Sequence, residues 1–356
     1  MNDFLEFVKP SVREISSYYL QDRSSKFKLN QNENPYDIPM WLKDEVFAEF
    51  RALPWNRYPS FRNEPLIGKL SKYVQVASEC LLVGNGSNEL LQMLTSIVLS
   101  KDKKLLLVTP TFQIYEQLGR IAEGEIYRID FEDDWSFPVE KILGALREET
   151  FQLCIFCSPN SPTGSTLHGP DLIEVLATTN GLVVVDEAYC EFSRKTFLKL
   201  QKEYGNLILT RTFSKAMGLA GLRIGYLIAH PRITREIIKA KLPYNLNIFS
   251  EFVATKLLNH RHLIQENINR IMTEKERLLQ ELLAMERVQV FPSQANFFMI
   301  ETPMHGTELF ERLLRHGVLV RDISKSHPRL RNKVRICVGT PSENDELIKA
   351  LQLCLS

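Results

Sequence analysis

Between about Leu66 and Ala229 the sequence alternates short apolar runs with stretches of helical character. The clearest apolar runs cover residues 103–110, 124–131, 152–159, 181–188, 206–213 and 223–229. Strands that are apolar along nearly their whole length are covered on both faces, which is typical of parallel sheets with crossover helices. The pattern therefore predicts an α/β fold with a mainly parallel sheet. Such sheets bind ligands beyond the carboxyl ends of their strands.

The C-terminal part of the chain has a different order of elements. From about Ser250 to Met285 apolar residues recur at helical spacing, which predicts one long helix or two nearly continuous ones. Then follow predicted strands at 288–293 and 296–301, a helix at 307–317, strands at 318–323 and 333–340, and a closing helix at 343–355. We therefore expect an N-terminal arm (1–30), a large domain (31–245) and a smaller α+β C-terminal domain (246–356).

Composition excludes several classes of protein. A chain of 356 residues can hold two cores, and a formal net charge of +1 favours neither nucleic acid nor an anionic membrane as a partner. No apolar run approaches a membrane span, and the start MNDFLEFVKP does not resemble a signal peptide, so we expect a cytoplasmic protein. The C-x-x-C pair Cys154 and Cys157 lies inside a predicted buried strand, which favours a structural over a redox role. We expect no metal site.

Residues 210–226 (TRTFSKAMGLAGLRIGY) place hydroxyls, a lysine and an arginine after a predicted strand. Thr212, Ser214 and Arg223 can bind a phosphate together, because a guanidinium pairs with phosphate oxygens through two hydrogen bonds. Lys215 adds an amine beside them. A lone lysine in a loop is usually only solvated. An amine next to a phosphate site at a strand end, however, is what a pyridoxal-phosphate (PLP) Schiff base requires.

A second strand, VVVDEAY (183–189), ends in an Asp-Glu pair. The magnesium-binding strand of P-loop ATPases has the same pattern, but it needs G-x-x-x-x-G-K-[ST]; at the nearest match Asn63 replaces the first glycine. In a PLP site, Asp186 would keep the pyridine nitrogen protonated, so that the ring can accept electrons. Tyr189 could donate to the phenolate oxygen of the ring.

Three further segments place polar or aromatic groups at predicted turns. VGNGSNELLQML (83–94) runs from a glycine turn into a helix, whose N-terminal amides favour a phosphate, although an ordinary helix start has the same pattern. Glu89 stands where a dinucleotide fingerprint needs its third glycine. Phe112, in TPTFQIY, can stack on a ring or simply pack. CSPNSPTG (157–164) puts short polar side chains at the same sheet edge.

Together these five segments resemble the fold-type I PLP enzymes, and specifically the class I/II aminotransferases. The resemblance covers nearly the whole chain in order and spacing, and the combination of DEAY, SK-x₇-R and PTG carries it. It implies the PLP-dependent transferase fold type I, with a large PLP-binding domain and a smaller C-terminal domain. It also implies a homodimer that transfers an amino group from a small-molecule donor to a keto acceptor.

The resemblance implies a role for each matching residue. Lys215 holds PLP covalently, while Asp186 and Tyr189 bind the ring nitrogen and the ring oxygen. Phe112 stacks on one face of the ring, and Ala188 lies beneath the other. The phosphate is held by Thr212, Ser214, Arg223, the amides of Gly86, Ser87 and Asn88, and, across a dimer interface, Tyr58.

The chain departs from the family at one position. The family usually has Asn immediately before Pro-Thr-Gly, where it donates to the ring oxygen, but this chain has Ser161. A hydroxyl can donate one hydrogen bond but is shorter than an amide, so the rate can differ. The preceding Asn160 starts from the other side of the turn, and the role does not pass to it.

Three other segments narrow the substrate: LNQNENPY (29–36), PYNLN (243–247) and VRD…VRICVGT (320–340). They resemble family members that exchange an amino group between a phosphorylated amine and glutamate. Such a site must bind a phosphate and carboxylates in turn, and arginine pairs with either. The resemblance assigns this task to Arg321 and Arg335, and adds Asn34 and Asn296 as substrate-binding residues. The other charged residues nearby are expected to be solvated: Lys325, Arg329, Arg331 and Lys333.

Three alternatives stay open. A threonine-phosphate decarboxylase is a close relative that also takes a phosphorylated substrate. An aromatic amino acid aminotransferase would accept a different keto acid. A PLP-binding transcription regulator has the same fold but needs a preceding DNA-binding domain, which we do not expect here.

Overall fold

The computed structural model describes residues 4–17 and 23–356, and at its centre lies a seven-stranded sheet with the order β2-β8-β7-β6-β5-β3-β4. The strands are β2 (Leu81–Gly84), β3 (Lys104–Thr109), β4 (Glu125–Asp130), β5 (Leu153–Cys157), β6 (Leu182–Asp186), β7 (Leu207–Thr212) and β8 (Gly225–Ile228). Only β8 runs antiparallel to its neighbours, β2 and β7. The predicted α/β fold with a mainly parallel sheet is confirmed.

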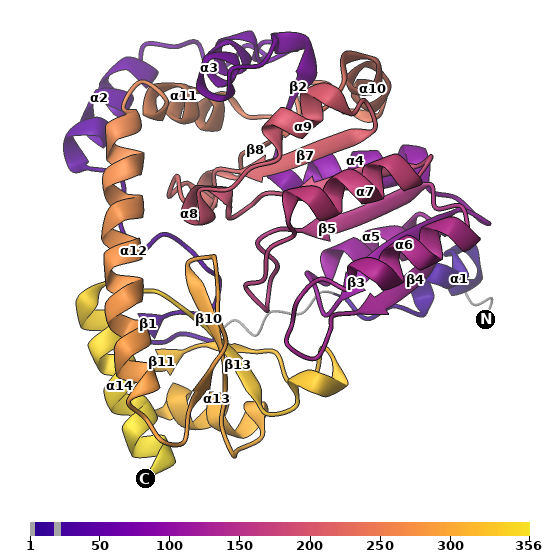
Figure 1. Ribbon diagram of the computed structural model, residues 1–356. Helices are drawn as coiled ribbons and strands as arrows, with labels where there is room; N and C mark the ends of the chain where they lie inside the picture. Colours follow the sequence, from indigo (N-terminus) through magenta and orange to yellow (C-terminus); the bar gives the residue numbers. More distant parts are fainter. Residues whose placement is uncertain (1–3, 18–22) are drawn as a thin grey trace.

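Helices cover both faces of this sheet (Figure 1). On β5, Ile155 belongs to the apolar cluster under α4 and α5, whereas Phe156 belongs to the cluster under α6 and α7. These helices are α4 (Ser87–Val98), α5 (Ile114–Ile121), α6 (Val139–Glu148) and α7 (Gly169–Thr178). Because successive side chains on a strand point to opposite faces, a strand buried on both faces is apolar throughout.

The same alternation separates the two cysteines of the C-x-x-C pair. Cys154 lies in the cluster under α6 and α7, and Cys157 lies in the other. Both thiols are free, and burial raises the pKa of each to about 12. Two thiols on opposite faces of one strand cannot pair, so the geometry supports the structural role expected from the sequence.

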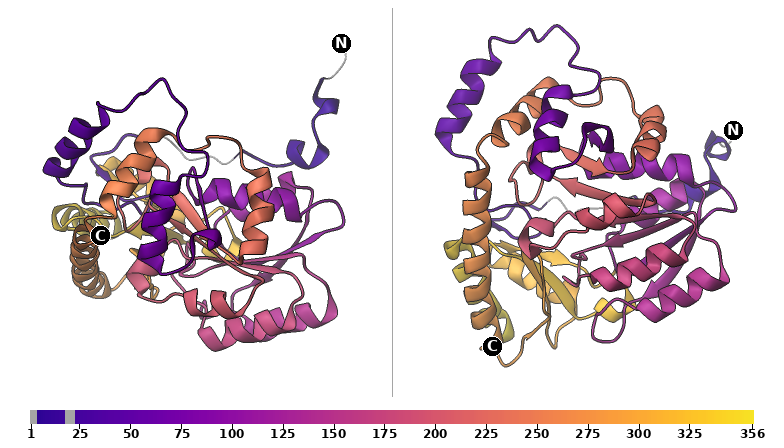
Figure 2. Two further views of the ribbon diagram at one scale, coloured as in Figure 1. Left: turned by 90° about the horizontal axis from the view of Figure 1, so that it is seen from above. Right: turned by 45° about the horizontal axis from the view of Figure 1, so that its top comes forward.

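The C-terminal part forms a second, four-stranded antiparallel sheet with the order β12-β13-β10-β9. Its elements are β9 (Gln289–Val290), β10 (Phe297–Glu301), α13 (Gly306–Arg315), β12 (Arg321–Asp322), β13 (Lys333–Cys337) and α14 (Pro341–Leu355). The helical stretch predicted before it is two helices, α11 (Ile248–Leu257) and α12 (Arg261–Leu283). Helix α12 runs along one side of the molecule to the C-terminal elements (Figures 1 and 2).

A short segment near the N-terminus joins this C-terminal part. Strand β1 (Phe27–Lys28) pairs in parallel with β11 (Val318–Leu319). The run predicted as one strand at 318–323 is therefore divided, because β12 pairs instead with β13. The amide of Cys337 also donates to the carbonyl of Leu29. The pair β1-β11 is a separate two-stranded sheet, and the hydrogen bond from Cys337 to Leu29 joins the end of this segment to β13.

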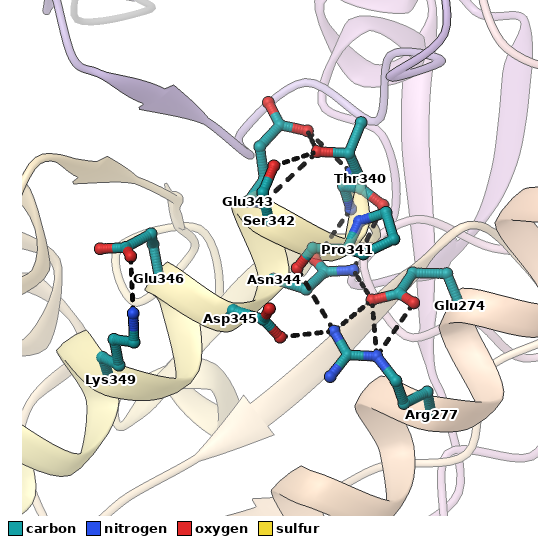
Figure 3. A network of polar contacts seen from close by, with 11 residues as sticks. Glu274, Arg277, Thr340, Pro341, Ser342, Glu343, Asn344, Asp345, Glu346 and Lys349 are labelled. Atoms are coloured by element: carbon teal, nitrogen blue, oxygen red, sulfur yellow. Dashed lines mark hydrogen bonds and ion pairs between the residues drawn. The ribbon is translucent and has the colours of Figure 1, made fainter.

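Helix α14 is fixed to α12 at its first turn (Figure 3). Thr340 forms a capping box at the start of α14. Glu274 of α12 accepts hydrogen bonds from Asn344 (2.9 Å) and Arg277 (2.6 Å). Thr340 follows β13 closely, so this network also holds the end of the strand that carries Arg335.

The remaining α-helices pack around these elements. They are α1 (Pro10–Arg13), α2 (Met40–Phe50), α3 (Glu64–Val74), α8 (Cys190–Ser193), α9 (Leu198–Glu203) and α10 (Pro231–Ile237). Helix α3 contacts β2, α9 contacts β7, α2 contacts α11 and α8 contacts α12. Within residues 4–17 and 23–356, none of the helices combines the length and the apolar character that crossing a membrane demands.

Candidate active site

A cavity of about 400 Å³ lies at the carboxyl ends of β6 and β7, where the central sheet meets the C-terminal sheet. It brings together most of the residues that the sequence predicted. Those in its lining are Ser87, Asn88, Phe112, Ser161, Asp186, Ala188, Tyr189, Thr212, Ser214, Lys215, Arg223, Arg321 and Arg335.

Four predicted residues are not in this lining. Gly86 directly precedes Ser87, at the N-cap of α4. Tyr58 is 81% exposed, and its ring stacks on Tyr244 with 4.4 Å between centroids. Asn34 and Asn296 instead support the main chain: Asn34 donates to the carbonyl of Ala216 (3.0 Å), and Asn296 to that of Asn32 (3.2 Å). Their amides therefore hold neighbouring segments in place.

Lys215 follows β7 in a turn and reaches into the cavity. Its Nζ donates to the main-chain carbonyl of Gln31 (2.6 Å). Loss of solvent around the amine, and next the positive charge of Arg335, lower the pKa of Lys215 to about 8. The lowered pKa increases the fraction of neutral amine near neutral pH, and a neutral amine is the form that attacks a carbonyl carbon.

Asp186, the last residue of β6, is buried at the floor of the cavity. Its carboxylate accepts hydrogen bonds from the hydroxyl of Tyr115 (2.7 Å) and from the amide of Ala188 (3.1 Å). Burial raises the pKa of Asp186, and these hydrogen bonds act against the rise. A cationic ligand group beside it would stabilise the carboxylate.

Tyr115 was missed by sequence reasoning. It lies at the start of α5, on the face of the sheet toward which Asp186 points. The only signal was its place near the start of the helix that follows a predicted strand end. A tyrosine near the start of such a helix usually packs in the core, and nothing in the sequence indicates that its hydroxyl reaches Asp186.

The neighbouring carboxylate, Glu187, points away from the cavity. It forms a buried ion pair with Arg211 (2.7 Å) and accepts hydrogen bonds from the amide of Phe197 and the hydroxyl of Thr196. Strand alternation thus divides the Asp-Glu pair between two environments. Only Asp186 belongs to the candidate site.

Ser214, Arg223 and the start of α4 converge at one end of the cavity. Arg223 Nη1 donates to Ser214 Oγ (3.1 Å), and Gly86 has a φ of 82°. A Cβ added to Gly86 would lie 2.6 Å from Nη2 of Arg223, so only glycine permits this approach. Hydroxyls, a guanidinium and the amides of a helix N-terminus form an arrangement that fits a phosphate.

Two arginines face each other at the other end. Arg321 on β12 is the direct cross-strand partner of Arg335 on β13. Arg335 donates from Nη1 to Ser161 Oγ (2.8 Å) and from Nη2 to the carbonyl of Asn30 (2.7 Å). Like charges opposite each other in a sheet destabilise it, and an anion between them removes the repulsion. The pair is therefore suited to bind an anionic group.

Ser161 and Asn160 lie in different surroundings. The hydroxyl of Ser161 lies in the cavity, whereas the Asn160 amide holds its own turn. Asn160 donates to the carbonyl of Pro110 (3.0 Å) and to Thr163 (2.9 Å), and it accepts from Thr111 (2.7 Å). Its side chain is thus fully engaged away from the ligand space.

One sequence expectation about charge was wrong. Lys325 and Arg331 are exposed, but Arg329 and Lys333 are not simply solvated. Arg329 donates to the carbonyls of Phe131 (2.6 Å) and Glu132 (2.8 Å), which lie after β4. Lys333 is buried and pairs with Glu301 at 2.8 Å.

Trp135 explains why these two cations are held. The guanidinium of Arg329 lies 4.3 Å from the centroid of the Trp135 ring, and the ammonium of Lys333 lies 5.8 Å from it. These contacts join the C-terminal sheet to the loop after β4. Arg329 and Lys333 therefore connect the C-terminal part to the loop after β4 beside the cavity.

The chain is similar to known aminotransferases along most of its length. The model of the family "Aminotransferase class I and II" matches residues 24–351. Histidinol-phosphate aminotransferase of Chlorobaculum parvum is 35% identical, over 99% of this chain and 99% of that protein. The corresponding protein of Prosthecochloris aestuarii is 36% identical, over 98% of both chains.

Solved structures show the same fold. Histidinol-phosphate aminotransferase from Sinorhizobium meliloti, in complex with pyridoxal-5'-phosphate, has a TM-score of 0.87 at 20% identity, covering 98% of this chain and 97% of that one. L-threonine-O-3-phosphate decarboxylase from Porphyromonas gingivalis has a TM-score of 0.80 at 23% identity, covering 92% and 98%. At these identities the likeness concerns the fold alone.

Proposed function

The chain belongs to the class I and II aminotransferases, a family of PLP-dependent transferases, and on that premise we propose that it acts on histidinol phosphate and 2-oxoglutarate. The products would be imidazole-acetol phosphate and glutamate, as in histidine biosynthesis. The curated relatives that cover nearly the whole chain carry this name. They do not favour the decarboxylase, aromatic aminotransferase or regulator alternatives.

The cavity residues fit the cofactor. Lys215 offers an amine with a lowered pKa, and the group of Ser214, Arg223 and the α4 N-terminus offers a phosphate site. The buried carboxylate of Asp186 would hold the protonated ring nitrogen, and Tyr189 would donate to the ring oxygen. When bound, PLP supplies an electron sink for the bond that breaks at the substrate carbon.

The cross-strand pair Arg321 and Arg335 is the observation that carries the substrate assignment. Two guanidiniums in one cavity can bind the phosphate of one substrate and the carboxylates of the other in turn, because both anions accept paired hydrogen bonds. Arg335 is held by Ser161 and by the carbonyl of Asn30, so its fork is oriented before the substrate arrives. Asn34 and Asn296 would act indirectly, by holding the segments around the cavity.

Lys215 would also serve in proton transfer. Once the substrate amine has replaced it, the neutral Nζ can take up the proton that leaves the substrate carbon. Its low pKa matters here, because a lower pKa leaves more of the amine unprotonated and able to accept a proton. The carbonyl of Gln31 gives the freed amine a fixed acceptor beside the reaction.

A homodimer with shared sites is part of the proposal. The segment from α2 to residue 61 exposes large apolar side chains: Met40, Trp41, Phe47, Leu53, Trp55, Tyr58 and Phe61. It lies at the outer edge of the molecule (Figure 2). Such exposure favours an interface with a second copy, where Tyr58 would reach the partner's phosphate site. Mixing Tyr58→Ala and Lys215→Ala subunits should partly restore activity, whereas an active monomer by light scattering would contradict the dimer.

The proposed location is the cytoplasm.

The substrate proposal can be tested with the cofactor spectrum of the purified holoenzyme. Glutamate should first convert the bound cofactor to its amine form, and a keto acid should return it. Histidinol phosphate should then drive the same conversion, and histidinol without its phosphate should do so poorly. If histidinol and its phosphate react alike, or neither reacts, the substrate assignment is wrong although the family stands.

A further inference from the structure

Three consecutive residues, Asn30, Gln31 and Asn32, each contact a different side chain of the cavity. The carbonyl of Asn30 accepts from Arg335 (2.7 Å), and that of Gln31 accepts from Lys215 (2.6 Å). The side chain of Asn32 donates from Nδ2 to the phenol oxygen of Tyr189 (2.9 Å). The first two contacts use the main chain, so only the third depends on which residue is present.

Asn32 is held in a defined orientation. It is fully buried, and its φ of 54° lies in the left-handed region that Asn, Asp and Gly tolerate best. Its amide N–H donates to Cys337 Sγ (2.8 Å), and the thiol in turn donates to Asn32 Oδ1 (3.0 Å). Burial raises the pKa of Cys337, so the thiol keeps the proton that it donates.

This thiol decides which end of the amide faces Tyr189. Because Oδ1 accepts from Cys337, Nδ2 must be the end that faces the phenol. An amide nitrogen donates and does not accept, so the phenol oxygen of Tyr189 accepts here. The single phenol proton therefore cannot point at Asn32. Tyr189 lines the cavity, which leaves the proton free to point toward the ligand.

We propose that Asn32 is a positioning residue that directs the hydroxyl proton of Tyr189 toward the ring oxygen of the cofactor. The proposal rests on the role of Tyr189 in the proposed function. Cys337 and Arg335 are two residues apart on β13 and so point to the same face. The position of β13 therefore determines where the guanidinium of Arg335 and the thiol of Cys337 lie.

Asn32→Asp is the sharpest test, because it keeps the shape and the backbone preference but replaces the donor with an acceptor. The phenol proton would then turn to the carboxylate and leave the ring oxygen without its donor. The ring oxygen becomes more basic, so the pH midpoint of the visible absorption of the bound cofactor should rise by about one unit. Asn32→Gly, which only removes the amide, should give a smaller rise.

A double-mutant comparison separates this role from a general effect of charge. In a Tyr189→Phe background there is no phenol proton to direct, so adding Asn32→Asp should leave the midpoint of Tyr189→Phe nearly unchanged. Cys337→Ala should raise the midpoint more than Cys337→Ser, because serine keeps a donor to Oδ1. A shift of the same size with and without the phenol would mean that Asn32 does not act through Tyr189.

The midpoint depends only on bound cofactor and not on the substrate. If the unmodified enzyme binds PLP but fails to convert histidinol phosphate, the proposed substrate is wrong while this measurement stands. If Asn32→Asp titrates at the same pH as the unmodified enzyme, the positioning role is wrong while the substrate test stands. Melting of the cofactor-free proteins checks that Asn32→Asp still folds, and Asn32→Gly gives a second variant should it not.

Discussion

The two sides of the cavity are held in different ways. On the central-sheet side, Asp186, Thr212 and Lys215 lie at or just after the ends of neighbouring strands, so the sheet itself fixes their spacing. On the other side, Arg335 belongs to a separate sheet. Hydrogen bonds to Ser161 and Asn30, which are 174 and 305 residues away in the sequence, hold it at the cavity. One side is therefore built within a single sheet, whereas the other exists only when the two parts of the chain dock.

This difference leads to different expectations for mutations. Changes on the central-sheet side should remove chemistry while the cavity keeps its shape. Changes on the side formed by the C-terminal sheet, here called the docked side, should weaken substrate binding. They should also change the pKa of Lys215, because the positive charge of Arg335 contributes to its lowering.

The largest effect is expected for Lys215→Ala. Covalent attachment of PLP should be lost, and transamination should fall by about 10³-fold or more, as for removal of other covalent catalytic groups. Borohydride reduction followed by peptide mapping measures the attachment directly. Labelling of a different lysine in the unmodified enzyme would refute the assignment.

The adjacent carboxylates should fail in opposite ways. Asp186→Asn should still bind PLP but lose roughly two to three decades of kcat, because a neutral amide does not hold the ring nitrogen protonated. Glu187→Gln should keep the chemistry but lower the free energy of unfolding by about 3 kcal/mol, because it leaves Arg211 buried without its anion.

Steady-state kinetics and denaturant unfolding of both variants separate the two losses. Activity of Asp186→Asn near that of the unmodified enzyme would remove Asp186 from its role. An unchanged free energy of unfolding for Glu187→Gln would mean that the ion pair with Arg211 does not contribute to stability.

The sequence predicted the central-sheet side well for a physical reason. Six of its strands were predicted, most of them from runs of apolar residues, although the edge strand β4 (EIYRID) is largely polar and mostly not buried. The turn residues around Lys215 and Asp186 are also local in the sequence. Strand β2 was missed because its four residues merge with the glycine turn that follows. Local pattern is sufficient wherever the partner is the next strand of the same sheet.

The docked side was predicted less well because its contacts join distant residues. Asn32 contacts Tyr189 across 157 residues, and nothing near Asn32 in the sequence reveals that partner. Arg329 was expected to be solvated, yet it binds carbonyls 197 and 198 residues away. The run 318–323 was predicted as one strand because the pattern cannot show that its halves pair with different strands.

A smaller effect is expected for Arg335→Lys. A lysine keeps the charge but not the paired hydrogen bonds, so kcat/KM should fall by about one to two decades in both half-reactions, or about 1.5–3 kcal/mol. Discrimination against dephosphorylated histidinol should shrink in the same variant. Loss in only one half-reaction would mean that Arg335 does not serve both anions and that Arg321 takes the other.

The smallest effect links the two sides through pH. In the cofactor-free protein only the neutral amine of Lys215 reacts with PLP, so the rate of covalent attachment should rise about tenfold per pH unit below pH 8 and level off above it. The positive charge of Arg335 is one cause of the lowered pKa. Arg335→Gln removes that charge, so the pKa of Lys215 should rise and the break in the rate profile should move to higher pH.

Stopped-flow absorbance at a series of pH values measures the break. Arg331→Gln, at an exposed arginine outside the cavity lining, is the matched control and should leave the break where it is. If Arg335→Gln also leaves it unmoved, loss of solvent alone sets the pKa, and the two sides of the cavity are electrostatically independent.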